Sequence, residues 1–165
     1  ATMNGINDRP SAIRYPRGCG EGVEIPAKPQ PLPIGKAQVL EQGSDVCLLA
    51  LGNMNSLAAE TAKLLQERGV SCTRVNARFI CPLDEECILR MAESHRLVVT
   101  LEDHVIAGGF GSAVLELLSS RGISTPVQCI GWPHAFVEHG SQQLLREKHG
   151  LTPQAIAETI LNRTK

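Results

Sequence analysis

The sequence of 165 residues has few aromatic side chains and no strong excess of charge of either sign. Only 3% of its residues are aromatic and its formal net charge is -1. A core with so few rings must be built from Leu, Ile, Val and Ala. No long basic block is present, which argues against a general nucleic-acid or anionic-membrane binder, because phosphate groups favour concentrated Lys and Arg.

Long apolar runs are also missing. The longest candidate, residues 46–51, has the length of a strand and falls far short of the roughly 20 residues that a membrane helix needs. Residues 1–10 include Asp8 and Arg9 and show no signal peptide. We therefore expect no nucleic-acid or membrane partner.

The sequence also lacks the cysteine and histidine spacings of common metal sites. Its six cysteines form no C-x-x-C pair, and several lie in apolar, strand-like segments, which indicates reduced buried thiols. His134 and His139 follow Cys129 at a spacing that fits no established zinc pattern. We expect no metal site, and a surface or interface position for both histidines.

Proline and glycine divide the chain into three parts. Residues 1–18 resemble the end of a preceding domain, with a short strand at 12–15 whose partners should lie elsewhere. Residues 19–35 are rich in Pro and Gly, which favours an extended linker. Residues 36–165 form the second domain.

Apolar segments and amphipathic segments alternate from residue 36 onward. Strands are expected at 46–51, 70–76, 97–101 and 127–130, with a candidate edge strand at 36–40 for which an antiparallel direction is open. Helices are expected at 55–68, after 82–84, and at 111–120, 141–149 and 153–163, with Ser141 and Thr152 as N-caps. Strands that are apolar throughout indicate an α/β fold: a three-layer αβα domain around a mainly parallel sheet of about five strands.

Ligands of such sheets gather beyond the carboxyl ends of the strands, so the loops at 52–56, 76–79, 102–111 and 131–134 are the candidate site. The glycine-rich loop before the third helix could hold an anion, although it lacks both the dinucleotide fingerprint and the P-loop pattern. Close helix–sheet packing is the favoured interpretation. Glu102, His104, Gly109 and Gly111 are therefore candidates for an anion or interface loop.

Arg14-Tyr15-Pro16-Arg17-Gly18 is the densest chemical signal in the sequence. A guanidinium group matches phosphate oxygens with two parallel hydrogen bonds. Pro16 ends the short strand, so Arg17 can project where ligands collect. Composition alone would favour two ordinary surface arginines.

Several blocks of the sequence closely resemble the 1-deoxy-D-xylulose-5-phosphate synthase family. They are residues 10–18, 31–36, 76–79 with 82–84, 100–104 with 108–112, and 136–140. The resemblance extends over essentially the whole chain, and its later part is shared in outline with transketolases and the β subunits of 2-oxo-acid dehydrogenases. It implies a C-terminal domain of transketolase type after the tail of a pyrimidine-binding domain.

Members of this family are transferases that condense pyruvate with glyceraldehyde 3-phosphate and release carbon dioxide. The product feeds isoprenoid, thiamine and pyridoxal synthesis. The resemblance implies that thiamine diphosphate and Mg²⁺ are bound by upstream domains, that the chain holds no catalytic residue, and that it is inactive alone. It also implies that Arg17 binds the phosphate of the aldehyde or product. The implied partners are the upstream domains and a second subunit of a homodimer. The implied location is cytoplasmic, of bacterial type, and a plastid location stays open for a longer chain with a transit peptide.

Two alternatives stay open. The chain could be a free-standing interaction module that binds a partner subunit, since the linker and the unpaired leading strand fit that role as well. It could also belong to a transketolase or to a 2-oxo-acid dehydrogenase β subunit. A phosphate preference at Arg17 would separate the synthase from these other enzymes.

Overall fold

The structure, a computed structural model, describes residues 1–16, 20, 22, 24 and 26–164. Its leading part contains a single 3-10 turn, η1 (Met3–Gly5). The elements that follow are β1 (Gln38–Glu41), β2 (Val46–Ala50), α1 (Met54–Glu67), β3 (Cys72–Asn76), α2 (Glu85–Ser94), β4 (Leu97–Val105), α3 (Phe110–Ser120), β5 (Val127–Trp132), α4 (Gln142–Lys148) and α5 (Pro153–Arg163). No helix in this described part is long and apolar enough to cross a membrane.

The five strands form one sheet in the order β1-β3-β2-β4-β5. β2 pairs in parallel with β3 and β4, and β4 pairs in parallel with β5. β1 joins the edge at β3 in the antiparallel direction. The expected mainly parallel sheet is confirmed, and the direction of its edge strand is now known.

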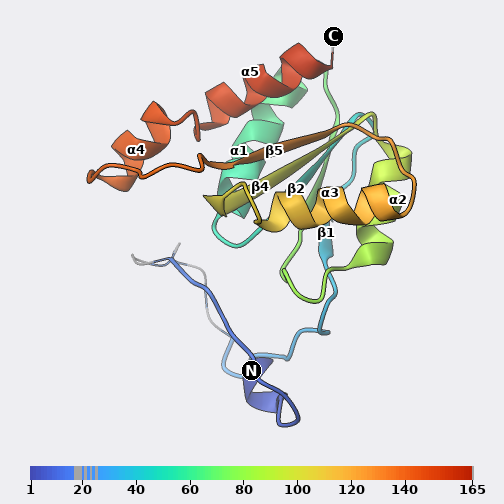
Figure 1. Ribbon diagram of the computed structural model, residues 1–165, viewed down its shortest axis with the longest axis vertical. Coiled ribbons are helices and arrows are strands. Elements are labelled where there is room, and N and C mark those ends of the chain that lie inside the picture. Colours follow the sequence, from blue (N-terminus) through green and yellow to red (C-terminus); the bar gives the residue numbers. More distant parts are fainter. Residues whose placement is uncertain (17–19, 21, 23, 25, 165) are drawn as a thin grey trace.

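Helices cover both faces of the sheet. α1 and α5 pack on one face over Val46, Leu48 and neighbouring side chains, while α2 and α3 pack on the other over Cys47 and Leu49 (Figure 1). Because successive strand residues point to opposite faces, a strand covered on both sides is buried throughout. All five residues of β2 are buried, so the three-layer αβα architecture is confirmed.

Side-chain caps fix where three helices begin. Ser141 and Thr152 accept hydrogen bonds from the amides of Leu144 and Ala155, as expected of N-caps. Asp84 caps α2 by accepting from the amide of Cys87 at 3.2 Å, and its other oxygen accepts from the amide of Ala37 at 2.9 Å. The same carboxylate therefore ties the start of α2 to the residue that precedes β1.

One expectation about strands was wrong, and a second stays a prediction. β4 runs to Val105 instead of stopping at residue 101, since its pairing with β5 resumes where Val105 lies opposite Trp132. Residues 12–15 form no strand among the described residues, which supply no hydrogen-bonded neighbour there, and their expected pairing with partners elsewhere stays a prediction. The proposed division at residues 18 and 35 stays a prediction, since much of 17–25 lies outside the described residues.

Candidate functional site at the carboxyl edge of the sheet

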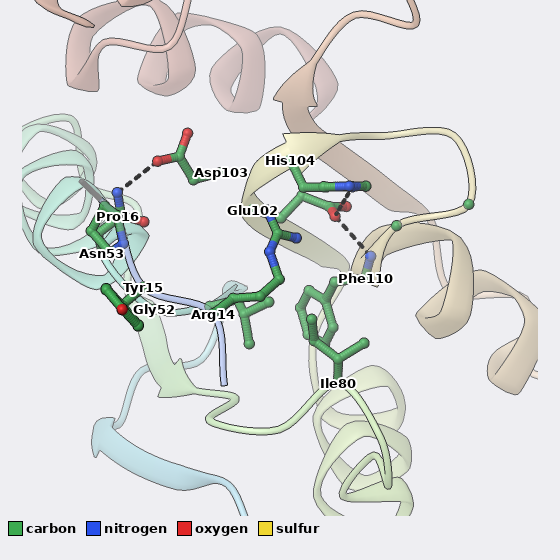
Figure 2. Close-up of a pocket in the computed structure, with 13 residues that line it drawn as sticks. Arg14, Tyr15, Pro16, Gly52, Asn53, Ile80, Glu102, Asp103, His104 and Phe110 are labelled. Carbon is green, nitrogen blue, oxygen red and sulfur yellow. Dashed lines mark hydrogen bonds and ion pairs between the residues drawn. The ribbon is translucent and has the colours of Figure 1, made fainter. Parts of the chain in front are cut away.

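A cavity of about 320 Å³ lies at the carboxyl edge of the sheet. One wall comes from residues 51–53 after β2, from 102–104 in β4 and from 108–110 at the start of α3. Ile80 and the leading residues 14–16 form the facing wall (Figure 2). Two of the four loops predicted for this edge, 52–56 and 102–111, thus contribute to one space, as expected for a parallel sheet. The loops at 76–79 and 131–134 do not line it.

Glu102 fills the start of α3 with its own carboxylate. Its side chain is only 1% exposed, and its oxygens accept hydrogen bonds from the amides of Phe110 and Gly111, each at 2.8 Å. The first amides of a helix lack partners within it, and the helix dipole favours negative charge there. Glu102 therefore acts as a built-in anion for α3.

Glycines make this close approach feasible. A Cβ atom at Gly109 would lie 2.1 Å from Glu102 Oε2 and 2.6 Å from the carbonyl oxygen of Val105. At Gly111 it would lie 2.6 Å from Thr100 Oγ1 and 2.7 Å from Cys129 Sγ. These positions need glycine for space, because neither glycine has a positive φ.

The remaining amides of the glycine-rich loop are also bonded. The amide of Gly108 donates to Ser112 Oγ at 3.0 Å, and that of Gly109 donates to the carbonyl of Ile106 at 3.1 Å. A foreign anion would have to displace Glu102 from the amides of Phe110 and Gly111, or break the bonds of Gly108 and Gly109 to Ser112 and Ile106. The anion and interface roles of Glu102, Gly109 and Gly111 both stay predictions, and the anion role now requires one of these changes.

His104 lies beside this buried carboxylate but reaches solvent. Its Nδ1 is 2.9 Å from the carbonyl oxygen of Val105 and 4.0 Å from Glu102 Oε2. A carbonyl can only accept, so Nδ1 carries the proton and Nε2 is the atom left for other contacts. The side chain is 40% exposed and lines the cavity, so His104 can take part in binding or proton transfer.

Asp103 points away from Glu102 and joins three elements (Figure 2). Its carboxylate accepts from Asn53 Nδ2 and from Trp132 Nε1, each at 2.7 Å, and Arg146 lies 3.5 Å away. Burial opposes ionisation, but the hydrogen bonds from Asn53 and Trp132 and the charge of Arg146 outweigh it, and the pKa of Asp103 is lowered. Asp103 thus ties α1, β5 and α4 together beside the cavity.

The partners of Asp103 were not among the residues predicted for the site. Asn53 and Trp132 lie in loops expected at this edge, so their position after a strand was a usable signal. Arg146 lies on α4, the short helix that packs no buried residue, and nothing in its sequence position pointed to the site.

Arg17, the predicted phosphate-binding residue, lies outside the described residues, and its role stays a prediction. Three residues earlier, Arg14 directs its side chain across the cavity toward Glu102, while Tyr15 lies beside Gly52 (Figure 2). The structure therefore brings the leading segment to the cavity together with three of the four predicted loop residues, Glu102, His104 and Gly109. The fourth, Gly111, does not line the cavity.

Metal-ligating and nucleophilic groups are scarce in the described residues. They contain no group of three or more His, Cys, Asp or Glu side chains placed to hold a metal ion. His134 and His139 are exposed. Burial raises the pKa of the Cys47, Cys72 and Cys87 thiols, so none of these three is an activated nucleophile.

Comparison with known proteins identifies the family of the second domain. The family model described as "Transketolase, C-terminal domain" matches residues 35–156. A 1-deoxy-D-xylulose-5-phosphate synthase of Desulforudis audaxviator (strain MP104C) is 49% identical over 154 residues, which cover 93% of this chain and 24% of the relative. The synthase of Heliobacterium modesticaldum (strain ATCC 51547 / Ice1) is 48% identical over 148 residues, which cover 90% of this chain and 23% of the relative. The chain thus spans about a quarter of the length of these relatives.

Solved structures agree on the fold. A protein described as "Split gene transketolase, inactive beta4 tetramer" is 35% identical with a TM-score of 0.75, over 81% of this chain and 43% of that one. The transketolase of Campylobacter jejuni subsp. jejuni NCTC 11168 is 20% identical with a TM-score of 0.58, over 78% of this chain and 18% of that one. The second likeness concerns the fold alone.

Proposed function

Because the chain belongs to the transketolase C-terminal domain family, we propose that it serves as the C-terminal part of a 1-deoxy-D-xylulose-5-phosphate synthase. Such a transferase condenses pyruvate with glyceraldehyde 3-phosphate and releases carbon dioxide. The observation that carries this proposal is the identity of 44–49% to curated synthases over 90–96% of the chain. The same identity over a quarter of each relative supports a C-terminal part rather than a whole enzyme.

The described residues do not fit thiamine diphosphate with Mg²⁺. The glycine-rich loop, which could otherwise hold a diphosphate, has its amides bonded to Glu102, Ser112 and Ile106. The described part of the chain also holds no cluster of three metal-ligating side chains. We therefore assign the cofactor and the metal ion to upstream domains of a longer protein, and no catalytic residue to this chain.

Arg17 is the residue of this chain that we assign to substrate binding. Its guanidinium would hold the phosphate of glyceraldehyde 3-phosphate and so orient the aldehyde for attack. The support is the Arg14-Tyr15-Pro16-Arg17-Gly18 block and the approach of residues 14–16 to the carboxyl edge of the sheet. The bacterial relatives support a cytoplasmic location for the protein.

Arg17→Ala in a protein that includes the upstream domains tests this role. A charge-assisted hydrogen bond contributes about 1.5–3 kcal/mol, so the KM for glyceraldehyde 3-phosphate should rise about 10-fold to 100-fold while that for pyruvate changes little. Arg9→Ala, on the same segment and paired with Asp8, is the matched control. Equal effects on both substrates would count against a phosphate role.

The 165-residue chain alone should form no 1-deoxy-D-xylulose 5-phosphate in the presence of both substrates, thiamine diphosphate and Mg²⁺. Product formation by this chain, purified free of host enzyme, would overturn the assignment of catalysis to upstream domains. The mass of the intact protein as isolated decides which form exists: about 17.8 kDa corresponds to this chain alone.

A second candidate function is that of a module that assembles with copies of itself. Phe136 is completely exposed, Leu144 on α4 is 59% exposed, and α4 packs no buried residue. Exposed apolar side chains on neighbouring segments mark contact surfaces. The solved relative described as an "inactive beta4 tetramer", a name that counts subunits and not strands, supports a second copy as the partner.

Light scattering on the purified chain tests self-association. Phe136→Ser should lower the average mass at a given concentration, and Leu115→Ser, which alters another exposed leucine on α3, should not. A wild-type chain that remains a monomer at high concentration would rule out this second candidate.

A further inference from the structure

Residues 133–149 are attached to the domain without an apolar core of their own. This segment, which we call the strap, comprises the loop after β5 and helix α4, and the structure, which describes all of it, shows no buried residue there. The strap lies beyond the end of β5, away from both faces of the sheet (Figure 1). Burial resumes at Leu151, which is 3% exposed. A segment with so little apolar burial is expected to open locally at low cost.

The strap meets the sheet through a charged group and a ring. Arg146 Nη2 lies 3.5 Å from Asp103 Oδ2 in β4. The His149 ring lies edge-on against Trp132 at the end of β5, with 5.6 Å between the ring centroids. The two residues of the sheet are themselves joined, since Trp132 Nε1 donates to Asp103 Oδ1 at 2.7 Å. The strap therefore docks on one small polar surface formed by Asp103 and Trp132.

Contacts inside the strap join its loop to its helix. Glu138 in the loop is paired with Lys148 on α4, and its carboxylate lies 3.7 Å from His149 Nε2. Ser141 Oγ accepts a hydrogen bond from the amide of Leu144, which fixes the start of α4. Because the loop and the helix are bound to each other, they can leave the sheet together.

Two buried nitrogen atoms lower the cost of opening. Arg146 Nε and His149 Nε2 are shielded from solvent and have no hydrogen-bond partner in the part of the chain that the structure describes. A buried polar group without a partner has lost its hydrogen bonds to water and regains them on exposure. The same two side chains contact Asp103 and Trp132, so each docking contact carries an opposing desolvation cost.

We propose that the strap opens and closes as a unit on Asp103 and Trp132, and that the ion pair between Arg146 and Asp103 sets how often it opens. The pair is only partly buried, with side-chain exposures of 23% and 22%, so salt weakens it. Asp103 also lines the cavity at the carboxyl edge. Opening removes the positive charge of Arg146 from beside Asp103 and makes that wall of the cavity more negative. The strap thus regulates the charge of the cavity, whether or not Phe136 and Leu144 contact a second copy.

Amide hydrogen exchange of the dilute 165-residue chain tests the opening. The amides bonded within α4 should have protection factors about 100-fold or more below those of β2 and β4, because the strap opens while the sheet stays folded. Raising the sodium chloride concentration from about 0.05 M to about 0.5 M should speed α4 exchange about threefold and leave the strands nearly unchanged. Protection of α4 as high as that of the strands would overturn the proposal, and so would α4 exchange that salt does not change.

A double-variant cycle tests whether α4 is held through Asp103. Arg146→Gln and Asp103→Asn should each speed exchange of the α4 amides about threefold to fivefold, and the two together should add little more, since both break the same contact. Arg121→Gln, which breaks an ion pair with Glu85 elsewhere on the domain, is the matched control and should leave α4 exchange unchanged. Fully additive effects, or an equal effect of Arg121→Gln, would overturn the role of the Arg146–Asp103 pair.

Fluorescence of Trp132, the sole tryptophan, separates opening of the strap from fraying of α4 alone. Arg146→Glu places like charges opposite each other at Asp103 and should open the strap, so acrylamide should quench Trp132 about twice as strongly once the His149 ring has left. Circular dichroism should show that the sheet stays folded. Arg121→Glu makes the same change at the end of α3 and should leave quenching unchanged. Faster α4 exchange in Arg146→Glu without a rise in quenching would mean fraying alone and would overturn opening as a unit.

Discussion

Glu102 and Asp103 are neighbours in β4, yet their surroundings hold the two carboxylates by different means. Glu102 is buried against α3 and is bound by backbone amides that glycines bring close. Asp103 is half-buried on the other side and is bound by side chains from α1, β5 and α4. A backbone donor is removed only by a substitution to proline, whereas side-chain donors can be removed singly by many substitutions. Substitution of the glycines or of the carboxylate should therefore cause a large loss of stability around Glu102. Around Asp103, each substitution of a single side chain should cause a smaller loss.

The largest loss of stability should follow Gly109→Ala. The added methyl group would overlap Glu102 Oε2 and the carbonyl of Val105, so either the amide bonds of Glu102 or the turn must give way. We expect a loss of about 3 kcal/mol in the free energy of unfolding, measured with denaturant. Gly5→Ala is the control, because a methyl group there meets no described atom within 4 Å. Equal stability of Gly109→Ala and wild type would refute the close approach.

Glu102→Gln should have the next largest effect. A glutamine has one acceptor oxygen, so one buried amide of α3 would face an NH₂ group and stay unpaired. The free energy of unfolding should fall by about 2 kcal/mol. Glu116→Gln makes the same chemical change at an exposed position of α3 and should be nearly neutral. Similar losses in both variants would show that charge, rather than the paired amides, matters at position 102.

Asp103→Asn should cost less, about 1.5 kcal/mol, since Asn53, Trp132 and Arg146 keep their positions and only one donor loses its acceptor. Asp8→Asn, at an exposed carboxylate, is the control. Denaturant unfolding at pH 7 measures both differences. If Asp103→Asn left the free energy of unfolding unchanged, the hydrogen bonds and the ion pair of Asp103 would add nothing to stability.

The Asp103 contribution should also depend on pH with a definite sign. The pKa of Asp103 in the folded protein lies below its ordinary value, so its stabilisation is complete above the unfolded pKa of about 3.9. Stabilisation is lost as the pH falls through the lower, folded pKa. The gap between wild type and Asp103→Asn should hence narrow on acidification below about pH 4. A gap that widens there would contradict the lowered pKa.

Trp132→Phe should have the smallest effect, about 1 kcal/mol or less, because it removes one donor and keeps an apolar ring. The edge contact between this ring and His149, at 5.6 Å between centroids, should persist. Circular dichroism must follow unfolding, since Trp132 is the sole tryptophan. A loss of stability as large as that of Asp103→Asn would show that the Trp132 hydrogen bond accounts for the whole contribution of Asp103.

These two carboxylates also show what the sequence could and could not predict. The alternation of apolar strands and helices predicted the layers and the parallel sheet, since periodicity reports which residues are covered. It also selected Glu102 and the glycines after it, because acids and glycines at a strand end are unusual. The same pattern predicted too early an end for β4, since Asp103 and His104 are polar residues typical of loops. It also missed Arg146, because a contact across 43 residues leaves no local pattern.

The double role of Asp84 has a mechanical consequence. Movement of the leading residues reaches the sheet through Ala37, whose amide Asp84 holds just before β1 begins. The other oxygen of Asp84 caps α2, so any tension is shared between an edge strand and a helix on the sheet face. β1 has four residues and pairs only with β3 in the described sheet. A force transmitted from a neighbouring part of the protein would therefore displace this edge strand first. The parallel strands would keep their positions.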